Sequence, residues 1–181
     1  KNFSIFEKEA HQNGYKLFKV ILSNIQNKFC EKYSETEYLN KNWIIDSIKT
    51  WPLFPDVIDG LKKLKTSYKL GIISNIDNDL LLESWKENID LFDFYITAED
   101  AETYKPNQKI FDLAIKKMEG NTSSWCHNGQ SYYHDIYPSN KMNIPCVWIR
   151  RYGNRFELDQ SKGTPTKIVD DISALEKLFR R

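Results

Sequence analysis

Three groups of polar residues follow predicted strands, and their residue types could together hold a negatively charged molecule. They supply a hydroxyl and an amide, then an ammonium group, then a second amide and hydroxyl with a carboxylate. A fixed positive charge beside donors that already point at an anion stabilises that anion in a water-poor site. The candidate residues are Ser74, Asn75, Lys105, Gln130, Ser131 and Asp135.

These groups should meet at one edge of a sheet. Parallel strands are joined by right-handed crossovers, so successive strand ends lie on the same side. Taken alone, Ser74-Asn75 is also typical of a turn, Lys105-Pro106 of an exposed loop, and Gln130-Ser131 with Asp135 of a helix cap. Their order and common edge favour a ligand site, because open α/β sheets bind ligands at the carboxyl ends of their strands.

The elements that must position these residues alternate between strands and helices. The run 69–74 is apolar and β-branched and stops abruptly at Ser74-Asn75, which is typical of a buried parallel strand. Such alternation predicts an α/β fold, a Rossmann-like doubly wound parallel sheet with helices on both faces. The predicted strands are 69–74, 92–96, 125–128, 147–149 and 167–169, and the predicted helices are 56–64, 78–85, 107–118, 135–142 and 173–179.

The first 50 residues have a different pattern. Apolar residues recur at the helical period over 2–33, with an interruption at Asn13-Gly14, and the capping box Ser34–Glu37 predicts the start of a second helix. Two prolines then punctuate Trp51–Pro55. We therefore predict a partial helical cap over 1–52 and an α/β core over 53–181.

Composition excludes several classes of function. The 181 residues include 26 Lys and Arg against 25 Asp and Glu, so a net charge of +1 argues against a nucleic-acid partner. No apolar run approaches the roughly 20 residues that span a membrane. Three widely spaced cysteines, without zinc-site spacing, suit reduced thiols. We expect a cytoplasmic protein with a small anionic partner, leaving a homodimer open.

The chain resembles the haloacid dehalogenase superfamily of hydrolases over nearly its whole length. Within that superfamily it is most similar to the branch of 2-haloacid and haloacetate dehalogenases. The residues that carry the resemblance are Trp51–Asp56, Ile73–Asp77, Thr97–Asp100, Tyr104–Pro106, Gln130–Ile136 and Val147–Ile149.

The resemblance implies a mechanism with a carboxylate nucleophile, which forms an enzyme ester that water then hydrolyses. Lys105 would balance the charge of an anionic site, and Asp135 would hold Lys105 or help to position water. Ser74 and Asn75 would bind the nucleophile or substrate, with Gln130 and Ser131 beside them. The implied substrate is a small 2-substituted carboxylate.

The family's nucleophile motif, Asp-x-x-Gly-Thr-Leu, does not occur in this sequence. In the family it lies on a first strand, between the strands that correspond here to 69–74 and 125–128. Without it, two strands would leave backbone groups unpaired, at a cost of about 1–3 kcal/mol each. We therefore expect that residues 1–181 belong to a longer chain and are inactive without the missing segment.

Three interpretations remain open. A metal-independent dehalogenase-like hydrolase is the first. A magnesium-dependent phosphatase is the second, although Gln130 stands where those enzymes have a magnesium-binding acid, so no metal ligand is assigned. A non-catalytic fragment or pseudoenzyme is the third. Phe111 replaces a tyrosine of the dehalogenases, while His127 and His134 are interpreted as a packed residue and an ordinary motif member.

Overall fold

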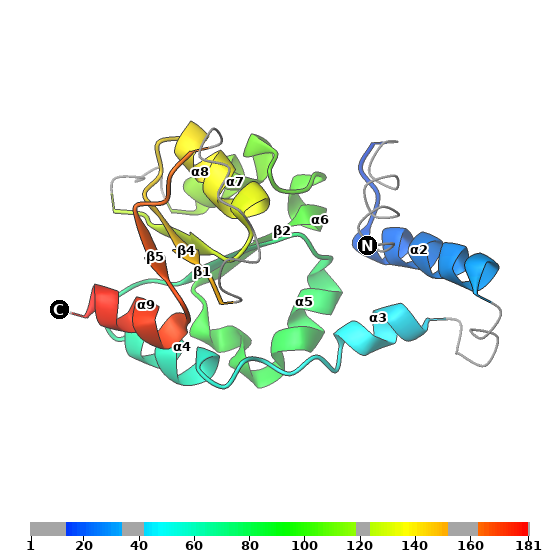
Figure 1. Cartoon of the computed structure of the whole chain (residues 1–181), viewed down its shortest axis with the longest axis horizontal. Coiled ribbons are helices and arrows are strands. Elements are labelled where there is room, and N and C mark those ends of the chain that lie inside the picture. Colours follow the sequence, from blue (N-terminus) through cyan, green and yellow to red (C-terminus); the bar gives the residue numbers. More distant parts are fainter. Residues whose placement is uncertain (1–13, 34–41, 119–123, 152–162, 181) are drawn as a thin grey trace.

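A computed structural model describes residues 14–33, 42–118, 124–151 and 163–180 of the chain (Figure 1). Its strands are β1 (Gly71–Ser74), β2 (Phe94–Thr97), β3 (His127–Gly129), β4 (Cys146–Ile149) and β5 (Lys167–Val169). Its helices are α2 (Phe18–Lys32), α3 (Trp43–Ile48), α4 (Val57–Lys65), α5 (Asn78–Trp85), α6 (Ala98–Ala101), α7 (Gln108–Lys117), α8 (Tyr137–Lys141) and α9 (Ile172–Phe179), with a 3-10 segment η3 (Lys86–Leu91) and a π-helical turn η4 (Tyr132–Ile136).

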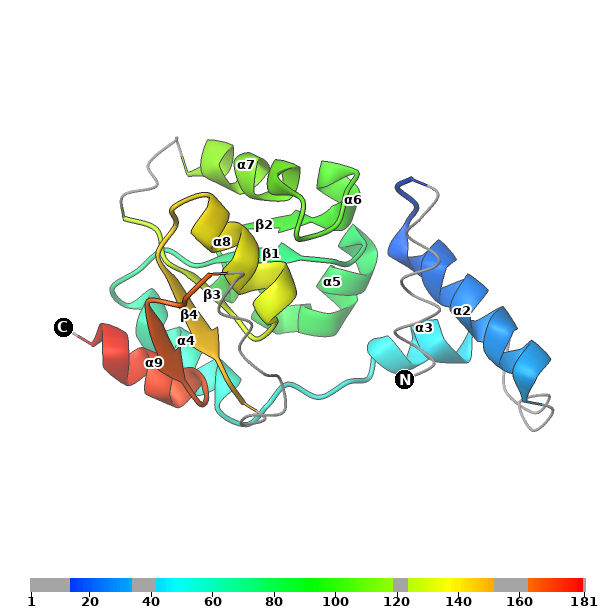
Figure 2. The ribbon, with the colours of Figure 1, turned by 45° about the horizontal axis from the view of Figure 1, so that its top comes forward.

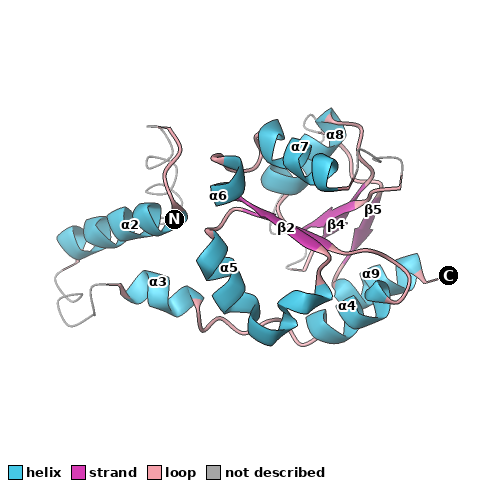
Figure 3. Cartoon of the chain, turned by 180° about the vertical axis from the view of Figure 1, so that it is seen from behind, coloured by secondary structure: helices cyan, strands magenta, loops and turns pink. Residues whose placement is uncertain are grey.

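All strand pairs are parallel, so the predicted α/β fold is confirmed. The described strands nevertheless form two sheets, β1 with β2, and β3 with β4 and β5. Helices α7 and α8 lie over one face of the strands, and α4 and α9 lie over the other (Figure 3). Apolar side chains fill the space between the strands and the helices on both faces. Ile110 and Phe111 of α7 are buried on one face, and Leu64 of α4 and Leu175 of α9 are buried on the other.

Helices α2 and α3 pack on each other beside this core (Figure 2). We call them the helical pair, and their shared buried residues are Ile21, Leu22, Ile25, Ile44 and Ile48. The predicted capping box at Ser34–Glu37 lies outside the described residues, as does the start of the helix predicted from residue 2. The division at residue 52 falls between α3 and α4 and stays a prediction.

Two carboxylates that directly precede helices bond to distant parts of the chain. Asp56 precedes α4, but its carboxylate accepts bonds from both terminal nitrogens of Arg151 at 2.8 Å and from the amide of Ile172 instead. Asp77 precedes α5 but makes no side-chain bond to it, and its carboxylate accepts the amides of Phe18 and Lys19. In both places a distant part of the chain offers the carboxylate better donors than its own helix does.

None of the helices in the described segments is both long enough and apolar enough to cross a membrane.

Candidate functional site

The side chains of Lys105 and Asp135 meet at the carboxyl ends of β1 and β3. The Lys105 ammonium donates to Asp135 Oδ1 at 2.7 Å and to the main-chain oxygen of Ile73, the penultimate residue of β1, at 2.9 Å. Only 12% of the Lys105 side chain and 7% of the Asp135 side chain are exposed. The crossovers therefore bring together two groups that lie 30 residues apart, as the strand-end argument predicted.

Asp135 is held from three directions. Besides Lys105, the Nε2 atom of His127 lies 3.2 Å from Oδ1, and the Ser131 amide donates to Oδ2 at 3.1 Å. Burial by itself would raise the pKa of Asp135, but the Lys105 charge and the bond from His127 outweigh it and keep that pKa well below its usual range. Asp135 therefore stays ionised at neutral pH and fixes the Lys105 ammonium.

The local sequence makes room for this carboxylate. Gly129 ends β3 directly beside it, and a Cβ atom added at this glycine would overlap the Asp135 side chain. The Ser131 hydroxyl accepts the His134 amide at 3.2 Å, which closes the turn that carries Asp135. The end of β3 and the turn η4 together set the position of the carboxylate.

Asn75 holds the Lys105 loop with its side chain. Its Oδ1 atom accepts the Lys105 amide at 2.6 Å, and its Nδ2 atom donates to the Lys105 carbonyl at 3.2 Å. The role expected for Asn75, binding of the nucleophile or substrate, stays a prediction, and the structure adds two bonds from its amide to the Lys105 backbone. Ser74 lies half-buried at the end of β1 and pairs in register with Thr97 of β2.

Gln130 and Ser131 lie on the other side of the site. The main-chain oxygen of Gln130 accepts a hydrogen bond from Trp148 Nε1 at 3.0 Å. Gln130 is exposed and lies at the rim of the cavity described below. The Ser131 hydroxyl lies 3.0 Å from His134 Nδ1. Ser131 therefore supports the turn, and Gln130 lies where a ligand that enters the cavity could contact it.

His127 is a neighbour of Asp135 that sequence reasoning missed. It was interpreted as a packed strand residue, and its ring does pack edge-on against Phe111 and Trp125, with centroids 5.3 and 6.1 Å away. It also contacts the same Asp135 oxygen as Lys105. Successive strand residues point to opposite faces, so the short run around β3 did not reveal which face His127 takes.

A cavity of about 930 Å³ separates the two sheets at this site. The β1 residues 71–73 line one side, the β3 residues 127–129 line the other, and Lys105 and Asp135 reach into it. Among the described residues, β1 pairs only with β2 and β3 pairs only with β4. The edges of β1 and β3 thus lie on opposite sides of the cavity, with backbone groups that no described strand uses.

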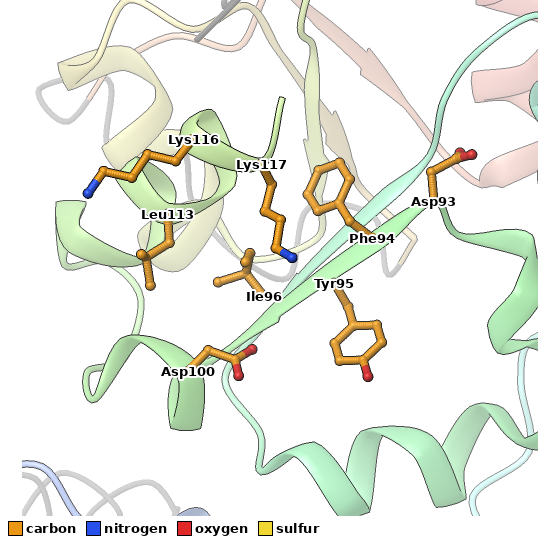
Figure 4. Close-up of a pocket in the computed structure, with 8 residues that line it drawn as sticks. All are labelled: Asp93, Phe94, Tyr95, Ile96, Asp100, Leu113, Lys116 and Lys117. Carbon is orange, nitrogen blue, oxygen red and sulfur yellow. The ribbon is translucent and has the colours of Figure 1, made fainter. Parts of the chain in front are cut away.

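A second pocket, of about 620 Å³, lies along the outer edge of β2 (Figure 4). Lys117 reaches across it toward the strand, while Lys116 points away from it (Figure 4). None of the predicted site residues lines this pocket. The candidate site is therefore the cavity between the sheets.

Metal ligands are not grouped within the part of the chain that the structure describes. No cluster of three or more His, Cys, Asp or Glu side chains there could hold an ion. Both oxygens of Asp135 already accept bonds from protein donors. The described residues offer an incoming anion a fixed ammonium group.

Comparison with known proteins agrees with this geometry. The chain is 26% identical over 134 residues to the glyceraldehyde 3-phosphate phosphatase of Methanothermobacter thermautotrophicus, covering 70% of this chain and 58% of that protein. It is 27% identical over 117 residues to (S)-2-haloacid dehalogenase 4A of Burkholderia cepacia, covering 63% and 50% respectively. The chain thus spans between half and three-fifths of these two relatives.

A solved dehalogenase structure shares the fold, with a TM-score of 0.83, 23% identity and coverage of 99% of this chain and 79% of that one. The sequence also matches the family described as haloacid dehalogenase-like hydrolase over residues 5–149. That match spans most of the chain and includes the ends of β1 and β3, Lys105 and Asp135. The chain therefore belongs to the haloacid dehalogenase-like hydrolase family.

Proposed function

We propose that this chain forms the charge-balancing half of a metal-independent hydrolase, which acts through an aspartyl ester on a small 2-substituted carboxylate such as a 2-haloacid. The observation that carries the proposal is the Lys105 ammonium, which is fixed by a buried carboxylate in the lining of a cavity. Similarity to 2-haloacid dehalogenases supports the substrate class.

Lys105 would balance the negative charges of the nucleophile and the substrate. The nucleophile and the substrate each carry a carboxylate, and two anions in one pocket require a fixed cation. An aspartate oxygen would attack C2 of the substrate, the carbon–halogen bond would break, and the halide would leave with its electron pair. Water would then hydrolyse the ester, which yields a 2-hydroxy acid and restores the aspartate.

The nucleophile would enter on a strand between β1 and β3. A strand there would run parallel to both neighbours and pair with the backbone groups that face the cavity. A residue at its carboxyl end would lie at the same edge as Lys105, because that edge carries the ends of β1 and β3. The Asp-x-x-Gly-Thr-Leu motif of the family is the expected sequence for this strand.

Asp135 would act as the positioning group for Lys105, with His127 as its second support. Both contacts go to Oδ1, so the carboxylate holds the ammonium and the imidazole at one point. Asn75 would fix the backbone of the Lys105 loop. Gln130, at the rim, would be the neutral donor nearest to an incoming substrate. The helical pair would act as the cap that covers the site.

A magnesium-dependent phosphatase is the alternative, favoured by the similarity to a glyceraldehyde 3-phosphate phosphatase. Gln130, where an acid would be needed, and the protein donors already bonded to both Asp135 oxygens argue against it. A non-catalytic binding role is the remaining alternative.

The test is product release by the chain with and without a synthetic peptide that carries the Asp-x-x-Gly-Thr-Leu motif. We expect chloride release from 2-chloropropionate that needs the peptide, persists in EDTA, and is lost in Lys105→Met. A matched peptide with asparagine in place of the aspartate is the control and should be inactive. Phosphate release from p-nitrophenyl phosphate that needs Mg²⁺ would establish the alternative instead. Absence of both activities, with the peptide bound, would contradict catalysis.

A further inference from the structure

One buried carboxylate has no part in the proposed reaction. Asp77 lies three residues after the end of β1 and is completely buried. It occupies the position before α5 but makes no capping bond to that helix. Burying a carboxylate is costly unless strong donors replace its water.

Those donors come from the helical pair. Asp77 Oδ1 accepts the Phe18 amide at 2.7 Å, and Oδ2 accepts the Lys19 amide at 2.9 Å. These are the first two residues of α2, whose preceding residue, Leu17, has no side-chain oxygen. The free amides at a helix start carry partial positive charge, so a carboxylate binds them well. Asp77 thus caps a helix that lies 59 residues earlier in the chain.

The same region of the core contacts the helical pair elsewhere. The Tyr104 hydroxyl donates to the Lys16 carbonyl at 2.7 Å, just before α2, and Tyr104 directly precedes Lys105. Ile76, beside Asp77, packs against the buried residues of the helical pair. Asn75 joins the two loops through the Lys105 backbone. The loop that holds α2 is therefore bonded to the loop that holds Lys105.

Other links along α5 are exposed ion pairs. Lys19 pairs with Asp79 at 2.6 Å and Lys49 pairs with Glu83 at 3.4 Å, with the carboxylates 57% and 49% exposed. Such surface pairs contribute little. In the Asp77 contact, by contrast, the donors are backbone amides and the acceptor is a fully buried carboxylate. Hydrogen bonds to an ionised carboxylate are charge-assisted and therefore strong. Figure 2 shows α5 on the side of the core that faces α2 and α3.

We propose that Asp77 is the positioning residue that docks the helical pair onto the site loops and thereby sets its placement relative to Lys105. The proposal is independent of the reaction assigned above, because it concerns only where the helical pair lies. It predicts that loss of this one carboxylate frees the helical pair while the α/β core stays folded.

The experiment measures the distance between the helical pair and the core. Spin labels are placed on Cys30, which is exposed on α2, and on α7 through Lys116→Cys, with Cys126→Ser to avoid a third label. We expect one narrow distance distribution in the parent protein and a broad one in Asp77→Ala. Amide exchange at Phe18 and Lys19 should accelerate by at least about tenfold. Exchange in α7 should not change.

A second variant separates docking from mere helix capping. Leu17→Ser, added to Asp77→Ala, gives α2 a local cap of its own. Protection of α2 should recover, while the distance distribution stays broad. A narrow distribution in Asp77→Ala, or its full recovery in the double variant, would overturn the proposal.

Controls keep the comparison interpretable. Glu83→Gln and Asp79→Asn remove the exposed pairs and should leave the distribution narrow. Broadening in these variants equal to that in Asp77→Ala would assign the docking to surface charge and contradict the role of Asp77. If Asp77→Ala does not fold, Asp77→Asn, which keeps one acceptor oxygen, takes its place in the same comparison.

Discussion

Replacing Lys105 with methionine should destabilise the protein strongly at neutral pH. Methionine keeps an apolar stem of similar length and removes only the ammonium group. Breaking a buried ion pair typically costs about 3–5 kcal/mol, because the remaining charge is left without compensation. Asp135 would keep the donors from His127 and Ser131, so we expect the lower end, about 3 kcal/mol. Stabilities of whole domains are only about 5–15 kcal/mol.

The effect should depend on pH with a definite sign. In the parent, burial opposes ionisation but the Lys105 charge keeps the pKa of Asp135 below its unfolded value. That pair therefore contributes stability above about pH 4, and the contribution is lost as pH falls through the folded pKa. In Lys105→Met the pKa of Asp135 should rise. The loss in free energy of unfolding, relative to the parent, should therefore be smaller at acidic pH.

Urea unfolding followed by tryptophan fluorescence at pH 7 and pH 4 measures both quantities, since Trp148 is buried beside the site. The exposed residue Lys109, which lies 3.9 Å from Glu102, gives the matched control Lys109→Met, expected to change stability by under about 0.5 kcal/mol. A deficit below about 1 kcal/mol in Lys105→Met, or one that is equal at both pH values, would refute the reasoning.

Three further predictions concern other groups. His127→Phe keeps the ring packing but removes the donor to Asp135, so urea unfolding should show a loss of about 1–2 kcal/mol, and an unchanged midpoint would contradict the contact. Bonds from Arg151 lower the pKa of Asp56 to about 2, so Asp56→Asn should remove about 2 kcal/mol at pH 7 and progressively less between pH 4 and pH 2, as acid titrations of unfolding would show. Burial raises the pKa of Cys126 to about 11, so an aromatic disulfide reagent at pH 8 should react first with the exposed Cys30, and mass spectrometry that finds Cys126 labelled first would be the opposing result.

Short-range sequence patterns predicted the strands and the edge of the sheet at which the site residues meet. Apolar runs gave the parallel strands, and the handedness of crossovers placed Lys105 close to Asp135. The contacts that the sequence did not reveal are polar and distant. Asp77 accepts bonds from residues 58 and 59 positions away, and nothing in the loop around it signals that partner.

The sequence did not reveal the protein partners of two polar side chains in the site. Asn75 was expected to bind the nucleophile or substrate, and the sequence did not show that the backbone of Lys105 offers its amide both a donor and an acceptor. His127 was assigned to packing alone, because a three-residue strand does not fix which face a side chain takes. The gap between the two sheets lies where the family resemblance predicted that a strand would be missing, between β1 and β3.

The central claim is that the cavity between β1 and β3 receives a strand that brings a carboxylate to Lys105. Amide hydrogen exchange of the folded chain, with and without the Asp-x-x-Gly-Thr-Leu peptide, tests it most directly. The account predicts that amides of residues 71–74 and 127–129 not already bonded to β2 or β4 become protected together. Protection of only one edge, or of neither when the peptide is in excess, would contradict it.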